Sequence, residues 1–175
     1  MVDDHELWKQ IRLGDAQAFD AFYRELAPRV FGFVRQLTGN RQAAEDVMQE
    51  TFTQLWRTPN GFDPEKGSLR GYLFGMARKG AAGWWRKHES NDGTLADESS
   101  ACTTELNSLV SDAFQKLDED QRSLLWLREV EGQSYAELAQ ALEIPIGTVR
   151  SRLFTAREEL RTVWHSERQV KKVAL

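Results

Sequence analysis

Apolar residues recur at steps of three and four along almost the whole sequence, and almost nowhere in the alternating pattern of a β-strand. Such steps place side chains on one face of an α-helix, because a helix turns once in about 3.6 residues. Pro28 lies inside the first apolar stripe, which predicts a kink or break near Ala27. The sequence predicts an all-α fold. The first stripe consists of Phe19, Phe22, Tyr23, Leu26, Val30, Phe33, Val34 and Leu37.

Two more helices are expected in the first half of the chain. One spans residues 41–57, with Ala44, Val47, Met48, Phe52, Leu55 and Trp56 facing inward and Glu45, Asp46, Gln49, Glu50 and Thr53 facing outward. Prolines and glycines then mark a loop to about residue 67. The other helix spans residues 68–87 and buries Leu69, Leu73, Met76, Ala77 and Trp84.

Residues 89–104 are polar, small and acidic, and Leu95 is their only sizeable apolar side chain. Such a segment cannot bury enough surface to offset the entropy of the chain, so a flexible acidic linker is expected. The expected organisation is two small helical domains, residues 1–88 and 106–165, joined by linker 89–105 and followed by a tail, 166–175.

The charges are divided along the chain although the net charge is only −4. A basic block covers residues 68–88 and an acidic block covers residues 89–120, which indicates separate electrostatic roles. Cys102 is the only cysteine, and His5, His88 and His165 are far apart, so neither a metal site nor a cofactor is expected. No catalytic group stands at a usable spacing, so an enzyme is not expected.

No apolar run approaches the roughly 20 residues that cross a bilayer, and the N-terminus lacks an apolar signal core. A cytoplasmic protein without membrane insertion is expected.

Four short helices are expected in the second half. Ala113, Phe114 and Leu117 continue a stripe begun by Leu106, Leu109 and Val110. A second stripe, made of Leu124, Leu125, Leu127 and Val130, ends at Gly132.

The segment from Ser134 to Trp164 predicts a helix-turn-helix. Ser134 and Glu137 have the spacing of a capping box, and Pro145 and Gly147 bracket a tight turn. The second helix turns Val149, Leu153, Ala156 and Leu160 inward and Thr148, Arg150, Ser151, Arg152, Phe154, Thr155 and Arg157 outward. Such a face enters the major groove of DNA, where arginines bind guanine edges or phosphates. The alternative is an ordinary helical hairpin with a solvated basic face.

Three segments together resemble the extracytoplasmic-function (ECF) sigma factors of the sigma-70 family. Residues 134–139 and 144–153 (SYAELA and IPIGTVRSRL) resemble the element that reads the −35 promoter sequence. Residues 44–52 and 55–57 (AEDVMQETF and LWR) resemble the helix that binds core polymerase. Residues 62–74 (FDPEKGSLRGYLF), with Ala77 and Arg78, resemble the −10 loop and melting helix. The resemblance implies a factor that binds core RNA polymerase and directs it to promoter DNA.

The resemblance also implies roles for individual residues. Asp46, Gln49, Glu50 and Thr53 would contact core polymerase, although a merely solvated face is the alternative. A base flipped from the −10 element would be held by Asn60, Phe62, Asp63, Lys66 and Ser68. The phosphates of the DNA backbone would be contacted by Arg70, Arg78, Lys79, Arg86 and Lys87. Phe62 is equally well explained as a loop anchor packed on the core. Packing is favoured over base stacking for Trp84 and Trp85.

The sequence departs from the family pattern at several positions. Lys79 and Gly83 stand where Asn and Asp are common, Gly80 replaces an apolar residue, and Glu143 stands where the turn often has Gly. Gly75, Gly80 and Gly83 weaken their helix by about 1 kcal/mol each relative to alanine. Thr155 stands where a basic residue is frequent, so no promoter preference is implied.

An anti-sigma factor is an expected partner, since members of the family are typically held by one. The alternative function is a stand-alone helix-turn-helix transcriptional regulator, whose first domain would be a sensor.

Overall fold

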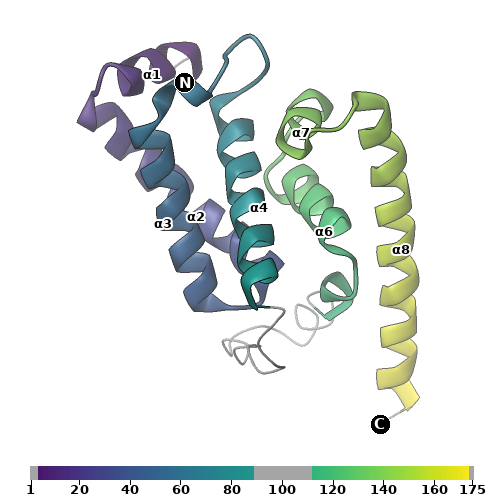
Figure 1. The fold of residues 1–175 in the computed structure, drawn as a ribbon. Coiled ribbons are helices and arrows are strands. Elements are labelled where there is room, and N and C mark those ends of the chain that lie inside the picture. The colour runs from purple at the N-terminus through teal and green to yellow at the C-terminus, as the bar shows by residue number, and fades with distance from the viewer. Residues whose placement is uncertain (1–3, 89–111, 174–175) are drawn as a thin grey trace.

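The computed structural model describes residues 4–88 and 112–173, which contain helices and no strand. Two groups of helices lie side by side (Figure 1). The first holds α1 (Asp4–Arg12), α2 (Ala16–Thr38), α3 (Arg41–Arg57), the 3-10 turn η1 (Pro59–Gly61) and α4 (Leu69–His88). The second holds helical residues 112–115, α6 (Glu119–Leu125), the π-helical turn η2 (Trp126–Val130), α7 (Tyr135–Leu142) and α8 (Ile146–Val173). The predicted all-α class is confirmed. The predicted linker and the stripe residues Leu106, Leu109 and Val110 lie outside the described residues.

Helix α2 continues through Pro28 as a single helix, so of the kink or break predicted near Ala27 the break does not occur. Pro28 cannot donate a backbone hydrogen bond, but Leu26 and Val30 on either side of it are buried in one core. Tertiary packing of both parts on the same core keeps the helix continuous, as packing commonly outweighs local propensity. Helix α1, which the periodicity did not predict, adds Trp8 to that core.

Helices α3 and α4 bury most of the predicted side chains against α2. Phe33 and Phe74 meet edge to face at 5.4 Å between ring centroids. Trp56 departs from the prediction, because 38% of it remains exposed while its ring packs on Phe19. Met76 and Trp84 are only half-buried. The fully buried members of the predicted sets are Ala44, Val47, Phe52, Leu55, Leu69, Leu73 and Ala77.

The core of the second group contains Leu124, Leu125 and Leu127, but Val130 is 56% exposed, contrary to the predicted stripe. The physical reason is η2, since a π-helical turn adds a residue to the helical turn and rotates the residues that follow it. The inward face predicted for α8 is confirmed, because Val149, Leu153 and Ala156 are buried and Leu160 packs against the core.

The two groups are in direct contact, mainly between α4 and α7 and between α2 and α6. The side chain of Gln115 donates a hydrogen bond to the backbone carbonyl of Gln36 over 3.1 Å. The ring of Trp126 lies beside Gly32 of α2, 3.6 Å from where a Cβ atom would stand. Helix α4 is therefore enclosed between its own group and the second one (Figure 1).

Candidate nucleic-acid and protein interfaces

An acidic face lies on the outer side of α3. Asn40 caps the start of the helix, since its side chain accepts a hydrogen bond from the backbone N–H of Ala43 at 2.8 Å. Asp46, Gln49 and Glu50 are exposed, and Thr53 is half-buried one turn later. All four predicted residues therefore reach the surface of one helix. In contrast, neighbouring Thr51 is buried and donates its hydroxyl to the carbonyl of Val47.

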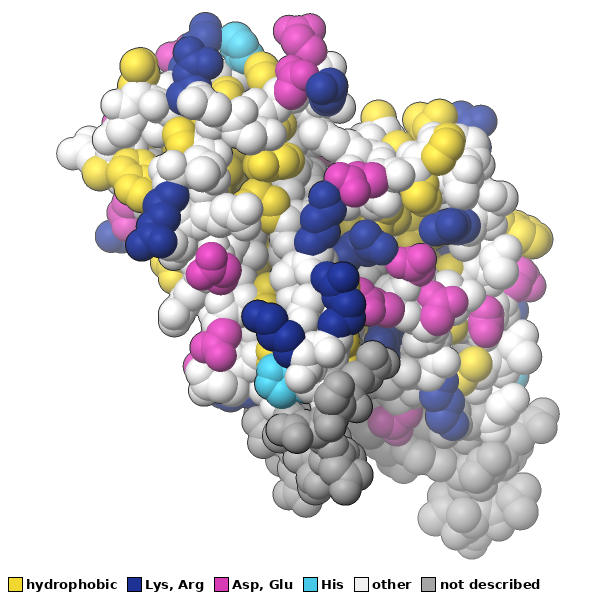
Figure 2. All heavy atoms as spheres, viewed as in Figure 1, with side chains coloured by type: hydrophobic (Ala, Val, Ile, Leu, Met, Phe, Trp, Pro, Cys, Tyr) yellow, Lys and Arg dark blue, Asp and Glu magenta, His cyan; other side chains and the backbone are white. Residues whose placement is uncertain are grey.

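A groove of about 720 Å³ runs beside this face, between α3, α4 and α7. Asp46 and Glu50 line its α3 side, Lys79 and Lys87 its α4 side, and Glu143 its α7 side. Lysine and arginine side chains gather along the middle of this face of the molecule, with acidic side chains to either side (Figure 2). The groove is thus rimmed by both signs of charge.

The turn between α7 and α8 has the geometry expected of a helix-turn-helix. Ser134 and Glu137 form both hydrogen bonds of the predicted capping box. Glu143 ends α7 in the left-handed region at φ 55°, a conformation that glycine adopts without cost. Glu143 therefore occupies a backbone conformation that favours glycine.

The leading face of α8 is open to solvent. Phe154 is 68% exposed, and the remaining predicted residues are exposed except for half-buried Thr148. The Arg150 guanidinium lies 5.9 Å from the ring centroid of Tyr135, and Arg157 pairs with Glu129 at 2.6 Å. Arg152 lies 3.5 Å from Asp120 of α6. An aromatic ring, hydroxyls and arginines thus occupy one accessible helical face. The predicted outward set is Thr148, Arg150, Ser151, Arg152, Phe154, Thr155 and Arg157.

The loop before α4 has an exposed part and an anchored part. Asn60 and Lys66 are exposed, and Lys66 pairs with Asp63 at 3.1 Å. The hydrogen bond from Lys66, with a second from the backbone of Glu65, holds the pKa of Asp63 below its ordinary value. Phe62 is buried, 5.2 Å from the Trp8 ring between centroids. Its position fits the loop-anchor alternative, because its ring is not accessible to a base.

The cations of α4 are distributed between two environments. Arg86 and Lys87 are exposed near its C-terminal end. Arg70, Arg78 and Lys79 instead pair with carboxylates of the second group of helices: Glu131 at 2.8 Å, Asp120 at 2.6 Å and Glu143 at 2.6 Å. Periodicity could not find these pairs, since the partners are more than forty residues apart along the chain.

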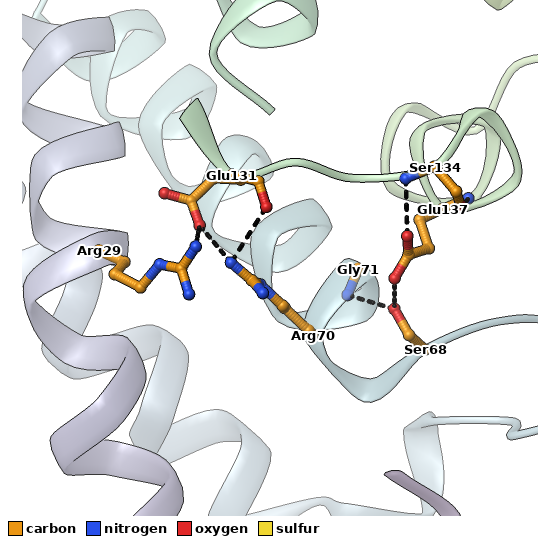
Figure 3. A network of polar contacts seen from close by, with 7 residues as sticks. All are labelled: Arg29, Ser68, Arg70, Gly71, Glu131, Ser134 and Glu137. Carbon is orange, nitrogen blue, oxygen red and sulfur yellow. Dashed lines mark hydrogen bonds and ion pairs between the residues drawn. The ribbon is translucent and has the colours of Figure 1, made fainter. Parts of the chain in front are cut away.

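The most buried of these carboxylates is Glu131, whose side chain is 2% exposed. Its Oε2 atom accepts a hydrogen bond from Arg70 of α4 at 2.8 Å and forms an ion pair with Arg29 of α2 at 2.9 Å. The same Arg70 nitrogen donates to the backbone carbonyl of Glu131 at 3.2 Å. Nearby, the Ser68 hydroxyl donates to Glu137 at 2.7 Å (Figure 3).

The two tryptophans near the end of α4 are engaged in packing. Trp84 stacks on His88 with 4.4 Å between ring centroids. The indole N–H of Trp85 donates to the carbonyl of Leu37 at 3.3 Å, and 38% of this residue is exposed. Both positions agree with the packing role favoured for these residues.

Residues 4–88 and 112–173 hold no group of three His, Cys, Asp or Glu side chains that could bind a metal ion. None of the helices within these ranges is both long and apolar enough to span a membrane.

Comparisons with known proteins agree on one family. Residues 22–91 match the family model Sigma-70 region 2, and residues 108–160 match Sigma-70, region 4. The RNA polymerase sigma-H factor of Pseudomonas aeruginosa is 29% identical over 176 residues, covering 90% of this chain and 91% of the relative. The ECF RNA polymerase sigma factor SigK of Mycobacterium ulcerans is 30% identical over 172 residues, covering 91% of this chain and 92% of the relative.

Two solved structures share the fold. CnrH in complex with the cytosolic domain of CnrY has a TM-score of 0.74 and 24% identity over 93% of this chain and 97% of that one. The sigma factor RpoE of Bartonella quintana, in complex with the anti-sigma factor NepR, has a TM-score of 0.69 and 24% identity over 85% of this chain and 97% of that one. Since both domain models match in order and the relatives align over nearly the whole length, this chain belongs to the ECF sigma factors of the sigma-70 family, which bind core RNA polymerase and direct it to promoters.

Proposed function

We propose that the two groups of helices divide the work of promoter-directed initiation. Residues 1–88 form the domain that binds core polymerase and acts on the −10 element, and residues 106–165 form the domain that recognises the −35 element. Residues 89–105 link them, and residues 166–175 are a tail into which α8 continues as far as Val173. One observation carries this proposal: an acidic face on α3 and an arginine-bearing face on α8 lie on separate helices, both exposed.

The polymerase-binding surface is the outer face of α3, made by Asp46, Gln49, Glu50 and Thr53. Exposed carboxylates on a rigid helix steer a partner with a basic surface and fix its orientation. Their side chains do not stabilise the core, because the apolar residues of α3 face the opposite way.

The −35 reading surface is the leading face of α8, made by Thr148, Arg150, Ser151, Arg152, Phe154, Thr155 and Arg157. Exposed arginines at the start of the second helix can form bidentate bonds to guanine, and the Phe154 ring can contact a thymine methyl group. Thr148 and Ser151 are short, so the helix can approach the groove closely.

The −10 surface combines the loop and α4. The side chains that would contact an extruded base are Asn60, Asp63, Lys66 and Ser68. Phe62 is buried and anchors the loop to the core. The phosphates are contacted by the cations of α4, and their counterions are released on binding. These cations are Arg70, Arg78, Lys79, Arg86 and Lys87.

An anti-sigma factor is the proposed regulatory partner, since the two structural neighbours described above are complexes, one of them with a named anti-sigma factor. The protein acts in the cytoplasm, where polymerase and promoters are found, and it acts by binding rather than by catalysis.

Charge reversal on α3 tests the proposal. We expect Asp46→Lys and Glu50→Lys to lower affinity for core polymerase by at least about tenfold, because like charges then face each other across the interface. The measurement is a titration of the labelled full-length chain with core polymerase, with circular dichroism as the check on folding. The control is Glu25→Lys, an equal reversal at an exposed position on α2. Wild-type affinity in both α3 variants would contradict the assignment of this face.

A further inference from the structure

Three arginines gather around Tyr135 at the start of α7, beside the leading face of α8. The Arg128 guanidinium lies 5.1 Å from the centroid of the Tyr135 ring, and the Arg150 guanidinium lies 5.9 Å from it. Arg157 is the third, and hydrogen bonds to Glu129, followed by the interaction with Tyr135, raise the pKa of its guanidinium above the ordinary value. Positive charge is therefore concentrated at one edge of the proposed −35 surface.

Glu129 supplies a carboxylate to this cluster. Its Oε1 atom accepts hydrogen bonds from Nε of Arg157 at 3.1 Å and from Nη2 at 2.6 Å. Two bonds from neighbouring donors of a planar guanidinium fix its orientation as well as its position. Within the part of the chain that the structure describes, no carboxylate pairs with Arg150. The two arginines therefore differ, because only Arg157 has both its direction and its charge set by a neighbour.

The carboxylate is placed by a turn that is itself held in position. Glu129 belongs to η2, and the next residues lead into α7. The Arg128 side chain donates to the backbone carbonyl of Gln133 at 2.6 Å, and the backbone N–H of Gln133 donates to the carbonyl of Leu127 at 3.0 Å. Leu127 and Gln133 are both buried. Glu129 is thus presented to α8 by an anchored segment.

The pair of Glu129 and Arg157 is accessible to solvent. The Arg157 side chain is 46% exposed and that of Glu129 is 53% exposed, and exposed ion pairs contribute little to the free energy of unfolding. Glu129 occupies only some of the N–H donors of the guanidinium, so others remain for a base edge or a phosphate. The arrangement therefore suits a role in recognition better than a role in stability.

We propose that Glu129 is a positioning residue that sets the specificity of the −35 surface through Arg157. The inference rests on the proposed function of α8. The carboxylate directs the guanidinium and offsets its charge, so an unmatched stretch of phosphate backbone attracts it less. Specificity is a difference between affinities, and weaker binding to wrong sequences increases it as effectively as tighter binding to the right one.

A double-mutant cycle in the holoenzyme tests this proposal. The variants are Glu129→Ala, Arg157→Ala and the two combined, each in the full-length chain bound to core polymerase. The templates carry a promoter that the wild-type holoenzyme uses, or the same promoter with one base pair of the −35 element replaced. The measurement is the initial rate of specific transcription at limiting holoenzyme. The penalty of each replacement is the ratio of the rates from the original and the replaced template.

We expect one position of the −35 element to depend on this pair. A replaced base pair typically lowers binding by about fivefold or more, and Glu129→Ala should reduce the penalty at that position by at least about threefold. Transcription from the replaced template should also fall more steeply with salt, because the released Arg157 gains a phosphate contact. Arg157→Ala should reduce the same penalty, and adding Glu129→Ala to it should change nothing further.

Glu158→Ala is the matched control, because it removes an acid that pairs with Arg161 of the same helix. It should leave every penalty as in wild type. An equal effect of Glu129→Ala with and without Arg157 would overturn the proposal, since the carboxylate would then act on DNA directly.

Two further results separate this proposal from the function of α8. Penalties that Glu129→Ala leaves unchanged would overturn the role of Glu129 alone, provided that Arg150→Ala still lowers transcription. If neither Arg150→Ala nor Arg157→Ala changes transcription from any template, the assignment of α8 to the −35 element is wrong, and the role of Glu129 is overturned with it.

Discussion

A Cβ atom on Gly75 would lie 3.0 Å from the carbonyl oxygen of Ala141, which belongs to the other domain. Two of the other glycines of this helix stand in different surroundings. A Cβ on Gly80 would lie 2.7 Å from Val47 of the same domain, whereas one on Gly83 would meet no closer atom than Arg86 Nη2 at 3.9 Å. Gly75, Gly80 and Gly83 weaken α4 alike, but of these three only Gly75 and Gly80 allow a close approach.

Gly75→Ala should loosen the contact between the domains. The added methyl group crowds the α7 backbone. The distribution of distances between spin labels at Gln17→Cys and Arg161→Cys, measured by pulsed electron paramagnetic resonance in a Cys102→Ser background, should therefore broaden. Gly83→Ala is the control, because it adds the same helix propensity without a clash and should raise stability by up to about 1 kcal/mol. An unchanged distance distribution in Gly75→Ala would mean that α7 shifts to accommodate a methyl group.

Gly80→Ala should destabilise the first domain without opening the chain. The new methyl group would overlap Val47, a β-branched side chain with few alternative rotamers. Overpacking costs about 1–3 kcal/mol, which exceeds the helix propensity gained. Chemical denaturation should therefore show a net loss of about 1 kcal/mol. A variant as stable as wild type would show that α3 and α4 can separate slightly at this crossing.

The sequence predicted the helices well where one apolar face decides the structure. Most residues in the stripes of α3, α4 and α8 were identified correctly because burial follows the helical period, although Trp56 is exposed. The break that Pro28 could have caused in α2 does not occur, since local propensity was outweighed by packing on both sides. Val130 was misplaced, because a π-helical turn changes the register and leaves no clear pattern in sequence.

The contacts between the two domains could not be predicted from the sequence. Glu131 resembles any other glutamate at the end of a helix, and nothing in its neighbours shows that Arg29 and Arg70 converge on it. The glycines of α4 were noticed as weaknesses of a helix, while their role at a close approach depends on where α3 and α7 lie. For the proposed binding faces, exposure could be predicted from periodicity, but not which cations would be paired.

Acid should weaken the contact between Ser68 and Glu137. Partial burial raises the pKa of Glu137, but hydrogen bonds from the Ser134 backbone and from the Ser68 and Ser134 hydroxyls, with the charge of Arg70, bring the pKa below its ordinary value. A lowered pKa means that the ionised group stabilises the fold above the pKa of an unfolded glutamate, about 4.3. This stabilisation is lost as the pH falls through the lower, folded value.

Ser68→Ala removes one of these hydrogen bonds and should move the pKa of Glu137 upward, toward its ordinary value. The measurement is a carboxylate titration by nuclear magnetic resonance in the full-length chain. Asp63, whose pKa depends on Lys66 and Glu65, should titrate unchanged and serves as the internal reference. An unshifted Glu137 titration would show that the capping box and the charge of Arg70 lower its pKa without Ser68.

Substitutions on α8 should separate DNA recognition from polymerase binding. Arg150→Ala removes a base or phosphate contact, and the expected cost is about 1–3 kcal/mol for a good base contact. Phe154→Ala removes an exposed ring, so promoter use should fall while the free energy of unfolding stays nearly unchanged. Arg161→Ala is the matched control, because Arg161 pairs only with Glu158 of its own helix among the contacts described for it.

These variants are compared by in vitro transcription and by titration with core polymerase. Arg150→Ala and Phe154→Ala should lower transcription from a promoter that the wild-type holoenzyme uses, whereas Arg161→Ala should not. All three should bind core polymerase like wild type, because α8 lies in a different domain from the acidic face of α3. If transcription is preserved in both Arg150→Ala and Phe154→Ala, the leading face of α8 does not read the promoter. Loss of polymerase binding in these variants would instead mean that α8 contacts the enzyme, since neither substitution removes a buried side chain.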